Sequence, residues 1–231
     1  MSTALADPPA KVRTPKPEVA EARPAFLEPP TEAPVAPLVQ AEPMPFKWTP
    51  DAYHLAAEAG MFGDSNVELI RGDIYMTPPP GPRHTRATNR LLYGLLDLFR
   101  RADGYIIEMA PPQTTRDSEP QPDVLVRRGD VDDLTSDPER VVLVVEASRS
   151  TLRYDRGLKL SLYAEHGYRE YWILNLVERV LEVHRDPRAV GDGTHTYGTK
   201  TTHGPDDLVV TLEKPDATVK VGDLLPPADL E

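Results

Sequence analysis

Apolar positions change their spacing along the chain, and the changes predict alternating helices and strands. Residues 141–145 are apolar without interruption, as expected of a strand that is covered on both faces. Between residues 84 and 101 the apolar positions recur instead at helical spacing. The stripe consists of Leu91, Leu92, Leu95, Leu98 and Phe99. A buried strand combined with an amphipathic helix indicates a layered α/β core.

Cap and turn residues place the other elements. A helix should begin after Thr49, with Pro50 at its first position, and end at Gly60. A hairpin is predicted over residues 67–76 around Gly72, and a second long helix over 152–166, closed by Gly167. The remaining predicted strands are 105–110, 123–127, 141–147, 170–175, 179–185 and one around 207–212.

The first 45 residues differ in composition from the rest. They are dense in Pro, Ala and Glu and nearly free of aromatic residues, so they cannot bury enough apolar surface to offset the entropy of ordering. Residues 1–45 are therefore interpreted as a disordered or polyproline-II-like arm, and residues 46–225 as one domain. The arm is a candidate for contacting a protein partner, in which case the chain would act as an adaptor.

Charge and cysteine content limit the possible functions. The chain carries 26 Lys and Arg against 37 Asp and Glu, a net charge of −11. Residues 1–45 contribute 4 − 6 = −2, so the remainder carries −9 and would repel a polyanion at long range. With no cysteine, disulfides and thiolate chemistry are excluded. No apolar run is long enough for a signal peptide or a membrane span, so we expect a soluble, cytoplasmic protein.

Two carboxylates stand where a packed core would not favour them. Asp123 lies at the start of a predicted strand, and Glu146 follows the apolar run 141–145. A buried carboxylate needs a partner or a metal ion, and if both residues lie at one sheet edge they could hold Mg²⁺, which activates water at a phosphodiester. The alternatives are a turn residue for Asp123 and an arginine partner for Glu146.

The helix after Glu146 adds a candidate cation. Asp155, Lys159 and Tyr163 are spaced by four residues and should share one helical face. Lys159 would then point toward the carboxylates, where an ammonium can orient water or neutralise charge on a phosphate, with Asp155 and Tyr163 in support. The alternative is an exposed Asp155–Lys159 ion pair of little energetic value.

Other polar residues have both functional and structural interpretations. Glu68 lies in the predicted hairpin, where it could join the site or pair with Arg71 or Arg83. His84 could contact phosphate, hold Glu68, or be incidental at a helix start. Tyr171 and Trp172 should pack in the core or line a cleft wall. A basic rim or a merely solvated surface is predicted for a set of arginines. These are Arg83, Arg86, Arg90, Arg149, Arg153 and Arg156.

Together these motifs resemble a known family. Pro122-Asp123-Val124, Val145-Glu146, Asp155-x3-Lys159-x3-Tyr163 and Gly167-x2-Glu170-Tyr-Trp-Ile-Leu174, in this order, are similar to the Uma-type restriction endonucleases of the PD-(D/E)XK nuclease superfamily. The resemblance covers roughly residues 46–190. It implies a restriction-endonuclease-like mixed β-sheet flanked by helices, with Asp123, Glu146 and Glu68 as Mg²⁺ or Mn²⁺ ligands and Lys159 as the catalytic lysine.

One position departs from the superfamily pattern. A lysine normally stands two residues after the glutamate, and Ser148 stands there in this chain, so the resemblance moves the lysine to the helix at Lys159. The leading hypothesis is a metal-dependent endonuclease that hydrolyses DNA, and a homodimer would suit cleavage of two strands. The alternative is a catalytically degenerate nuclease fold that binds nucleic acid or protein as a regulator.

Overall fold

The computed structural model describes residues 43–109, 115–132 and 137–228. The arm predicted over residues 1–45 lies almost entirely outside this part of the chain. From Pro45 onward the chain forms one compact unit. No helix of the described residues is long and apolar enough to cross a membrane.

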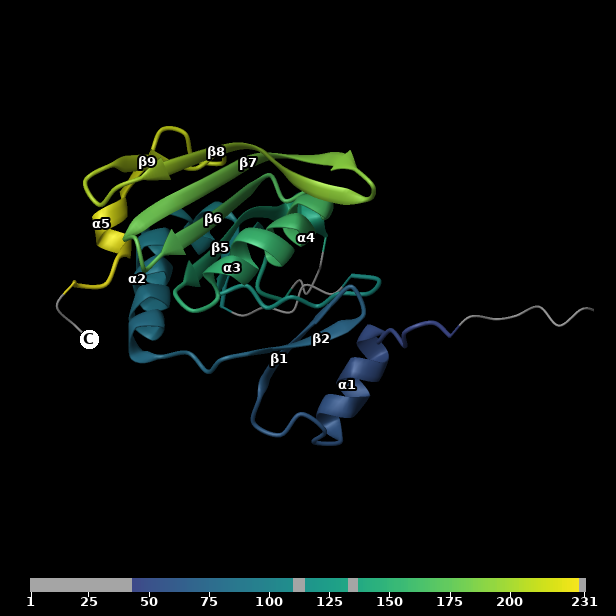
Figure 1. Cartoon of the computed structure of the whole chain (residues 1–231). Helices are drawn as coiled ribbons and strands as arrows, with labels where there is room; N and C mark the ends of the chain where they lie inside the picture. The colour runs from purple at the N-terminus through teal and green to yellow at the C-terminus, as the bar shows by residue number, and fades with distance from the viewer. Residues whose placement is uncertain (1–42, 110–114, 133–136, 229–231) are drawn as a thin grey trace, which may run out of the picture. The chain divides into compact units, whose positions relative to one another are not determined.

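A six-stranded mixed sheet forms the centre of this unit (Figure 1). Its strands follow the order β3 (Tyr105–Glu108), β4 (Val124–Arg128), β5 (Val141–Ser148), β6 (Glu170–Asn175), β7 (Val180–Gly191) and β8 (Thr194–His203). Only β5 and β6 are parallel, and their connection carries the helices that follow Glu146. All residues of β5 are buried, as the uninterrupted apolar run predicts.

Helices cover both faces of the sheet, and the two-residue period of β5 divides its side chains between them. Leu143, Val145 and Ala147 belong to the core cluster under α2 (Pro82–Leu98), joined by α5 (Val221–Leu224). Val144 belongs to the opposite cluster, under α3 (Leu152–Tyr154) and α4 (Leu160–Glu165). Glu146 and Ser148 follow Val144 at two-residue steps, so their side chains lie on the α4 face.

A smaller lobe precedes the sheet. It consists of α1 (Pro50–Glu58), capped by the Thr49 side chain, and the hairpin of β1 (Asn66–Ile70) and β2 (Asp73–Thr77). The lobe has its own apolar cluster, formed by Tyr53, Val67 and Leu69 with partly buried neighbours. Figure 1 shows it beside the six-stranded sheet rather than within it.

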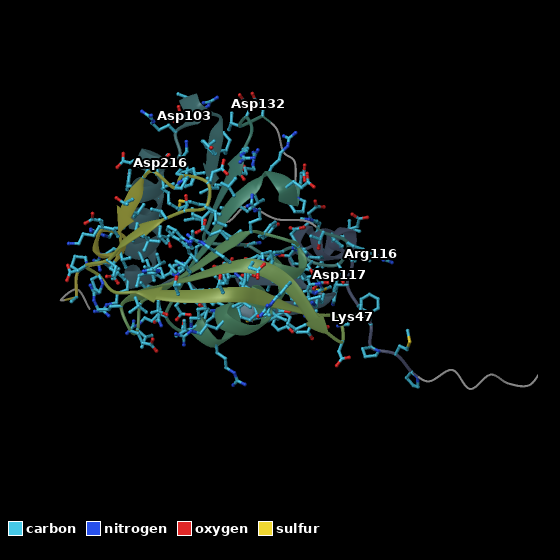
Figure 2. The ribbon with its side chains drawn as sticks, turned by 90° about the horizontal axis from the view of Figure 1, so that it is seen from above. Lys47, Asp103, Arg116, Asp117, Asp132 and Asp216 are labelled. Atoms are coloured by element: carbon cyan, nitrogen blue, oxygen red, sulfur yellow. The ribbon has the colours of Figure 1, made fainter. Side chains whose placement is uncertain are left out.

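Hydrogen bonds attach this hairpin to the rest of the unit. Leu69 forms a β-bridge with Glu119, and the Gly72 amide donates to the Asp117 carbonyl. Figure 2 shows Asp117 and Lys47 on the same side of the molecule. The backbone hydrogen bonds agree, because Gly72 donates to Asp117 and accepts from Trp48, the residue after Lys47. The hairpin is therefore fixed at its turn and along β1.

The sequence did not predict every element. Strand β8 has no apolar alternation, because its Thr-rich stretch is largely exposed at a sheet edge, so residues 194–203 gave no strand signal. The short β9 (Leu208–Val210) was expected, but its partner β10 (Thr218–Lys220) and α5 were missed. The predicted helix 152–166 contains a π-helical turn, η3 (Asp155–Lys159), that spacing alone could not indicate.

Replacing Leu143 by Ala should test the buried strand. Leu143 is fully buried in β5, so the substitution should lower the free energy of unfolding by roughly 2–5 kcal/mol through lost burial and a residual cavity. Leu96→Ala, at an exposed site on α2, is the matched control and should change stability by less than about 0.5 kcal/mol. Urea denaturation measures both, and equal losses would contradict the two-sided burial of β5.

Candidate active site

The antiparallel pairing of β4 and β5 brings Asp123 and Glu146 together. Val124 pairs with Val145, so the residue before β4 meets the residue after Val145. The Ala147 amide donates a 2.8 Å hydrogen bond to Asp123 Oδ2, and the Asp123 amide lies 3.3 Å from Glu146 Oε2. The two carboxylates that sequence reasoning paired are thus neighbours at one sheet edge.

Lys159 and Tyr163 reach Glu146 from the helix that covers this face. Lys159 Nζ and Tyr163 Oη each donate to Glu146 Oε1 at 2.8 Å. Lys159 and Asp155 are both only 3 % exposed, so the alternative of an exposed Asp155–Lys159 ion pair is wrong. The alternative of an arginine partner for Glu146 is also wrong, because the partner is a lysine.

Glu68 completes the group from the hairpin. Its Oε1 lies 3.1 Å from Lys159 Nζ, while its Oε2 is buried with no hydrogen-bond partner among the described residues. Arg71 does not pair with Glu68; it donates to Glu165 Oε2 at 2.6 Å and to Ser161. Arg83, the other arginine considered, donates to the Ala228 carbonyl, and the cation that contacts Glu68 is Lys159.

His84 joins the site through a different partner from the one considered for it. Its Nε2 lies 3.0 Å from Asp123 Oδ1 and its Nδ1 lies 2.9 Å from the Ala147 carbonyl, so it does not hold Glu68. Both neighbours are acceptors, which a doubly protonated imidazolium satisfies. The hydrogen bond to Asp123 accordingly raises the pKa of His84.

Ser148 takes a supporting position where the superfamily pattern has lysine. It follows Glu146 by two residues on the same face of β5, and its Oγ donates a 2.7 Å hydrogen bond to Asp155 Oδ2. A longer lysine side chain at position 148 would extend into the space that Asp155 occupies. The π-helical turn η3 supplies Lys159 to the same face instead.

The cluster holds more carboxylates than cations. Glu68, Asp123, Glu146 and Asp155 surround Lys159 and His84. Burial opposes a charge on Lys159, but the carboxylates of Glu146 and Glu68 outweigh it, so the pKa of Lys159 lies well above its usual value. Burial also raises the pKa values of Glu146 and Glu68, and Lys159 offsets this only in part. The excess negative charge favours binding of a further cation.

These groups face a cavity of about 670 Å³. Sequence reasoning missed three features of its lining: the backbone at Gln121, whose carbonyl lies 3.3 Å from Lys159 Nζ, the ring of Tyr154, and the proline-rich wall. The wall consists of Thr77, Pro78, Pro79, Pro80, Gly81 and Pro82. Tyr154 lies five residues before Lys159, outside the four-residue spacing of Asp155, Lys159 and Tyr163, and a run of prolines is typical of a loop without indicating a functional role.

The six arginines of the predicted basic rim separate into those that line the cavity and those that do not. Arg83 and Arg149 line the cavity, as the rim hypothesis predicts. Arg90 donates to the Asp223 carbonyl and Arg156 pairs with Glu182, and neither lines the cavity. Arg86 and Arg153 are exposed and also lie outside it.

Tyr171 and Trp172 are fully buried in the two core clusters, so they are core residues rather than a cleft wall.

Comparisons with known proteins agree with this architecture. A family model described as Uma2, putative restriction endonuclease, matches residues 50–219, and so confirms the predicted resemblance. The fold is similar to that of a putative nuclease belonging to DUF820 from Anabaena variabilis, with a TM-score of 0.54 and 16% identity over 70% of this chain and 90% of that chain. At this identity the likeness shows the fold alone. No curated protein matches the chain.

Removing Lys159 should cost more stability than removing the charge of one of its partners. Lys159→Met leaves Glu68 and Glu146 buried without their shared cation, and should lower the free energy of unfolding by about 3–5 kcal/mol in metal-free buffer. Glu146→Gln leaves Glu68 to pair with Lys159 and should cost clearly less. Chemical denaturation measures both, and equal losses would contradict a shared ammonium.

The same variant should show a pH dependence of known sign. Without Lys159 the raised pKa values of Glu68 and Glu146 have no cation to oppose them, so the native state binds more protons than the unfolded state. Stability then rises as pH falls. The deficit of Lys159→Met should be smaller at about pH 5.5 than at about pH 8, measured against wild type at each pH.

Proposed function

The chain belongs to the Uma2 family of putative restriction endonucleases, and from this membership and the geometry of the site we propose that it is a divalent-metal-dependent endonuclease that hydrolyses DNA phosphodiester bonds. The observation that carries the proposal is the convergence of Glu68 and Glu146 on the ammonium of Lys159, with Asp123 beside Glu146. All four residues line one cavity.

The donor chemistry of this site fits a hard divalent cation. As placed, the described residues contain no group of three or more His, Cys, Asp or Glu side chains that could hold a metal ion. Mg²⁺ and similar ions need only one or two protein carboxylates, because water and substrate phosphate complete the coordination. Asp123 and Glu146 are the adjacent pair, and Glu68, which shares Lys159 with Glu146 and whose Oε2 has no hydrogen-bond partner among the described residues, is the candidate for a third ligand. We propose these three residues as ligands of Mg²⁺ or Mn²⁺.

The remaining residues would position the reacting groups. A bound divalent ion would supply charge neutralisation at the phosphate and a lower pKa for the attacking water. Lys159 would donate a hydrogen bond to a phosphate oxygen or to the water from its place beside Glu146 and Glu68. Tyr163 holds the Glu146 carboxylate and His84 holds that of Asp123, so neither needs to reorient when substrate binds.

Isosteric removal of either paired carboxylate should abolish cleavage. Asp123→Asn and Glu146→Gln should each lower the rate of cleavage of single-stranded DNA and of plasmid DNA, assayed side by side with Mn²⁺, by more than about 100-fold, because loss of a ligand exceeds the usual cost of losing a residue that supports one. Asp216→Asn is the matched control and should keep wild-type activity, since Asp216 is exposed and does not line the cavity. Equal activity in all three variants would indicate a contaminating nuclease.

Metal binding gives an independent measurement. Calorimetric titration with Mn²⁺ should detect binding to the wild type and weaker binding to both carboxylate variants, with circular dichroism showing retained folding. Binding of Mn²⁺ without cleavage of any DNA would instead favour the regulatory, catalytically degenerate alternative. Absence of Mn²⁺ binding to folded wild-type protein would contradict the ligand assignment.

A further inference from the structure

We infer that the site accepts a single, unpaired DNA strand and excludes the intact double helix. The inference rests on the proposed nuclease function and names the substrate class of the same site. Three features of the described residues support it: the depth of the reactive groups, the rigid wall of the cavity, and the small number of cations at its mouth.

Three of the reactive groups are almost completely covered by the surrounding protein. Lys159 and Glu146 are each 3 % exposed and Glu68 is 6 % exposed, although all three line the cavity. A phosphate must therefore enter the cavity to approach the ammonium. At about 670 Å³, the space lies within the roughly 300–1,000 Å³ of pockets that hold one small molecule, so it has room for one nucleotide unit of a strand rather than for two paired strands.

The wall beside the reactive groups cannot easily move aside. Four of the five residues at positions 78–82 are proline, and all five line the cavity. Each proline ring fixes its own φ angle and restricts the residue before it, so the segment has few alternative conformations. Its ends are held by β2 and by the first turn of α2. Opening the site to the width of a duplex would require these elements to separate.

The few arginines that line the cavity suit the charge density of a single DNA strand better than that of a duplex. Arg149 lines the cavity, is exposed, and has no hydrogen-bond or ion-pair partner within the described ranges. Arg83 is the other lining arginine. A duplex carries one charge per about 1.7 Å of its axis and a single strand one per about 3.4 Å, so an acidic body repels the duplex more strongly. Arg149 is therefore the residue that we expect to hold a phosphate of the entering strand.

Cleavage of three related substrates tests the inference. They are a labelled DNA oligonucleotide, the same strand annealed to its complement, and the same duplex with a central unpaired bubble, each incubated with Mn²⁺ and full-length protein. The single strand and the bubble should be cut at least about 10-fold faster than the duplex, because the duplex must first lose base pairs and stacking. Cleavage in the bubbled substrate should map to the unpaired segment.

The possible outcomes separate this inference from the proposed function. Cleavage of the duplex as fast as the single strand would overturn the inference and leave the nuclease proposal standing. If none of the three substrates is cut by folded, Mn²⁺-bound protein, the proposed function is wrong and the inference is wrong with it. Fluorescence anisotropy with the Asp123→Asn variant then adds a binding measurement that does not depend on turnover.

Two variants test the structural reasons separately. Arg149→Ala should raise KM for the single strand several-fold and make it less dependent on salt, with kcat nearly unchanged, whereas Arg153→Ala, an exposed arginine outside the cavity, should change neither. Replacing Pro78, Pro79 and Pro80 by Gly-Ser-Gly should reduce the preference for the single strand. A preference unaltered by this loop variant would show that the proline wall does not exclude the duplex.

Discussion

The buried ammonium of Lys159 between Glu146 and Glu68 is the interaction on which the rest of the site depends. Burying any one of these charges alone would be costly, and each is tolerated because the others lie within hydrogen-bond distance. Glu146 comes from the central sheet, Lys159 from the connection between β5 and β6, and Glu68 from the small lobe. One cation therefore joins three parts of the protein and holds their carboxylates in one place.

The fold was largely predictable because its central elements have strong patterns. The apolar run at 141–145 indicated a doubly covered strand, and the leucine stripe from Leu91 onward indicated α2. Strand β8 was not predictable, since its exposed threonines carry no alternation, and the π-helical turn depends on packing rather than on residue type. Elements stabilised by tertiary contacts alone leave little trace in the sequence.

The sequence indicated which residues would come together, but not which atoms they would contact. Asp123, Glu146 and Lys159 were recognisable from charges beside apolar segments and from family resemblance, and the structure places them together. Their partners were harder to foresee. Two ring nitrogens of His84 contact Asp123 and Ala147, which are adjacent only because β4 and β5 pair in this register. Gln121 contributes a backbone carbonyl, which no side-chain pattern can indicate.

The attachment of the hairpin has a consequence for how the protein matures. Glu68 reaches Lys159 only when the small lobe is attached to the main sheet through the Leu69–Glu119 bridge and the Arg71–Glu165 ion pair. These contacts join segments far apart in the chain, and closing such long loops is slow compared with forming local structure. We therefore expect Glu68 to join Glu146 and Lys159 late in folding, after the strands of the main sheet have paired.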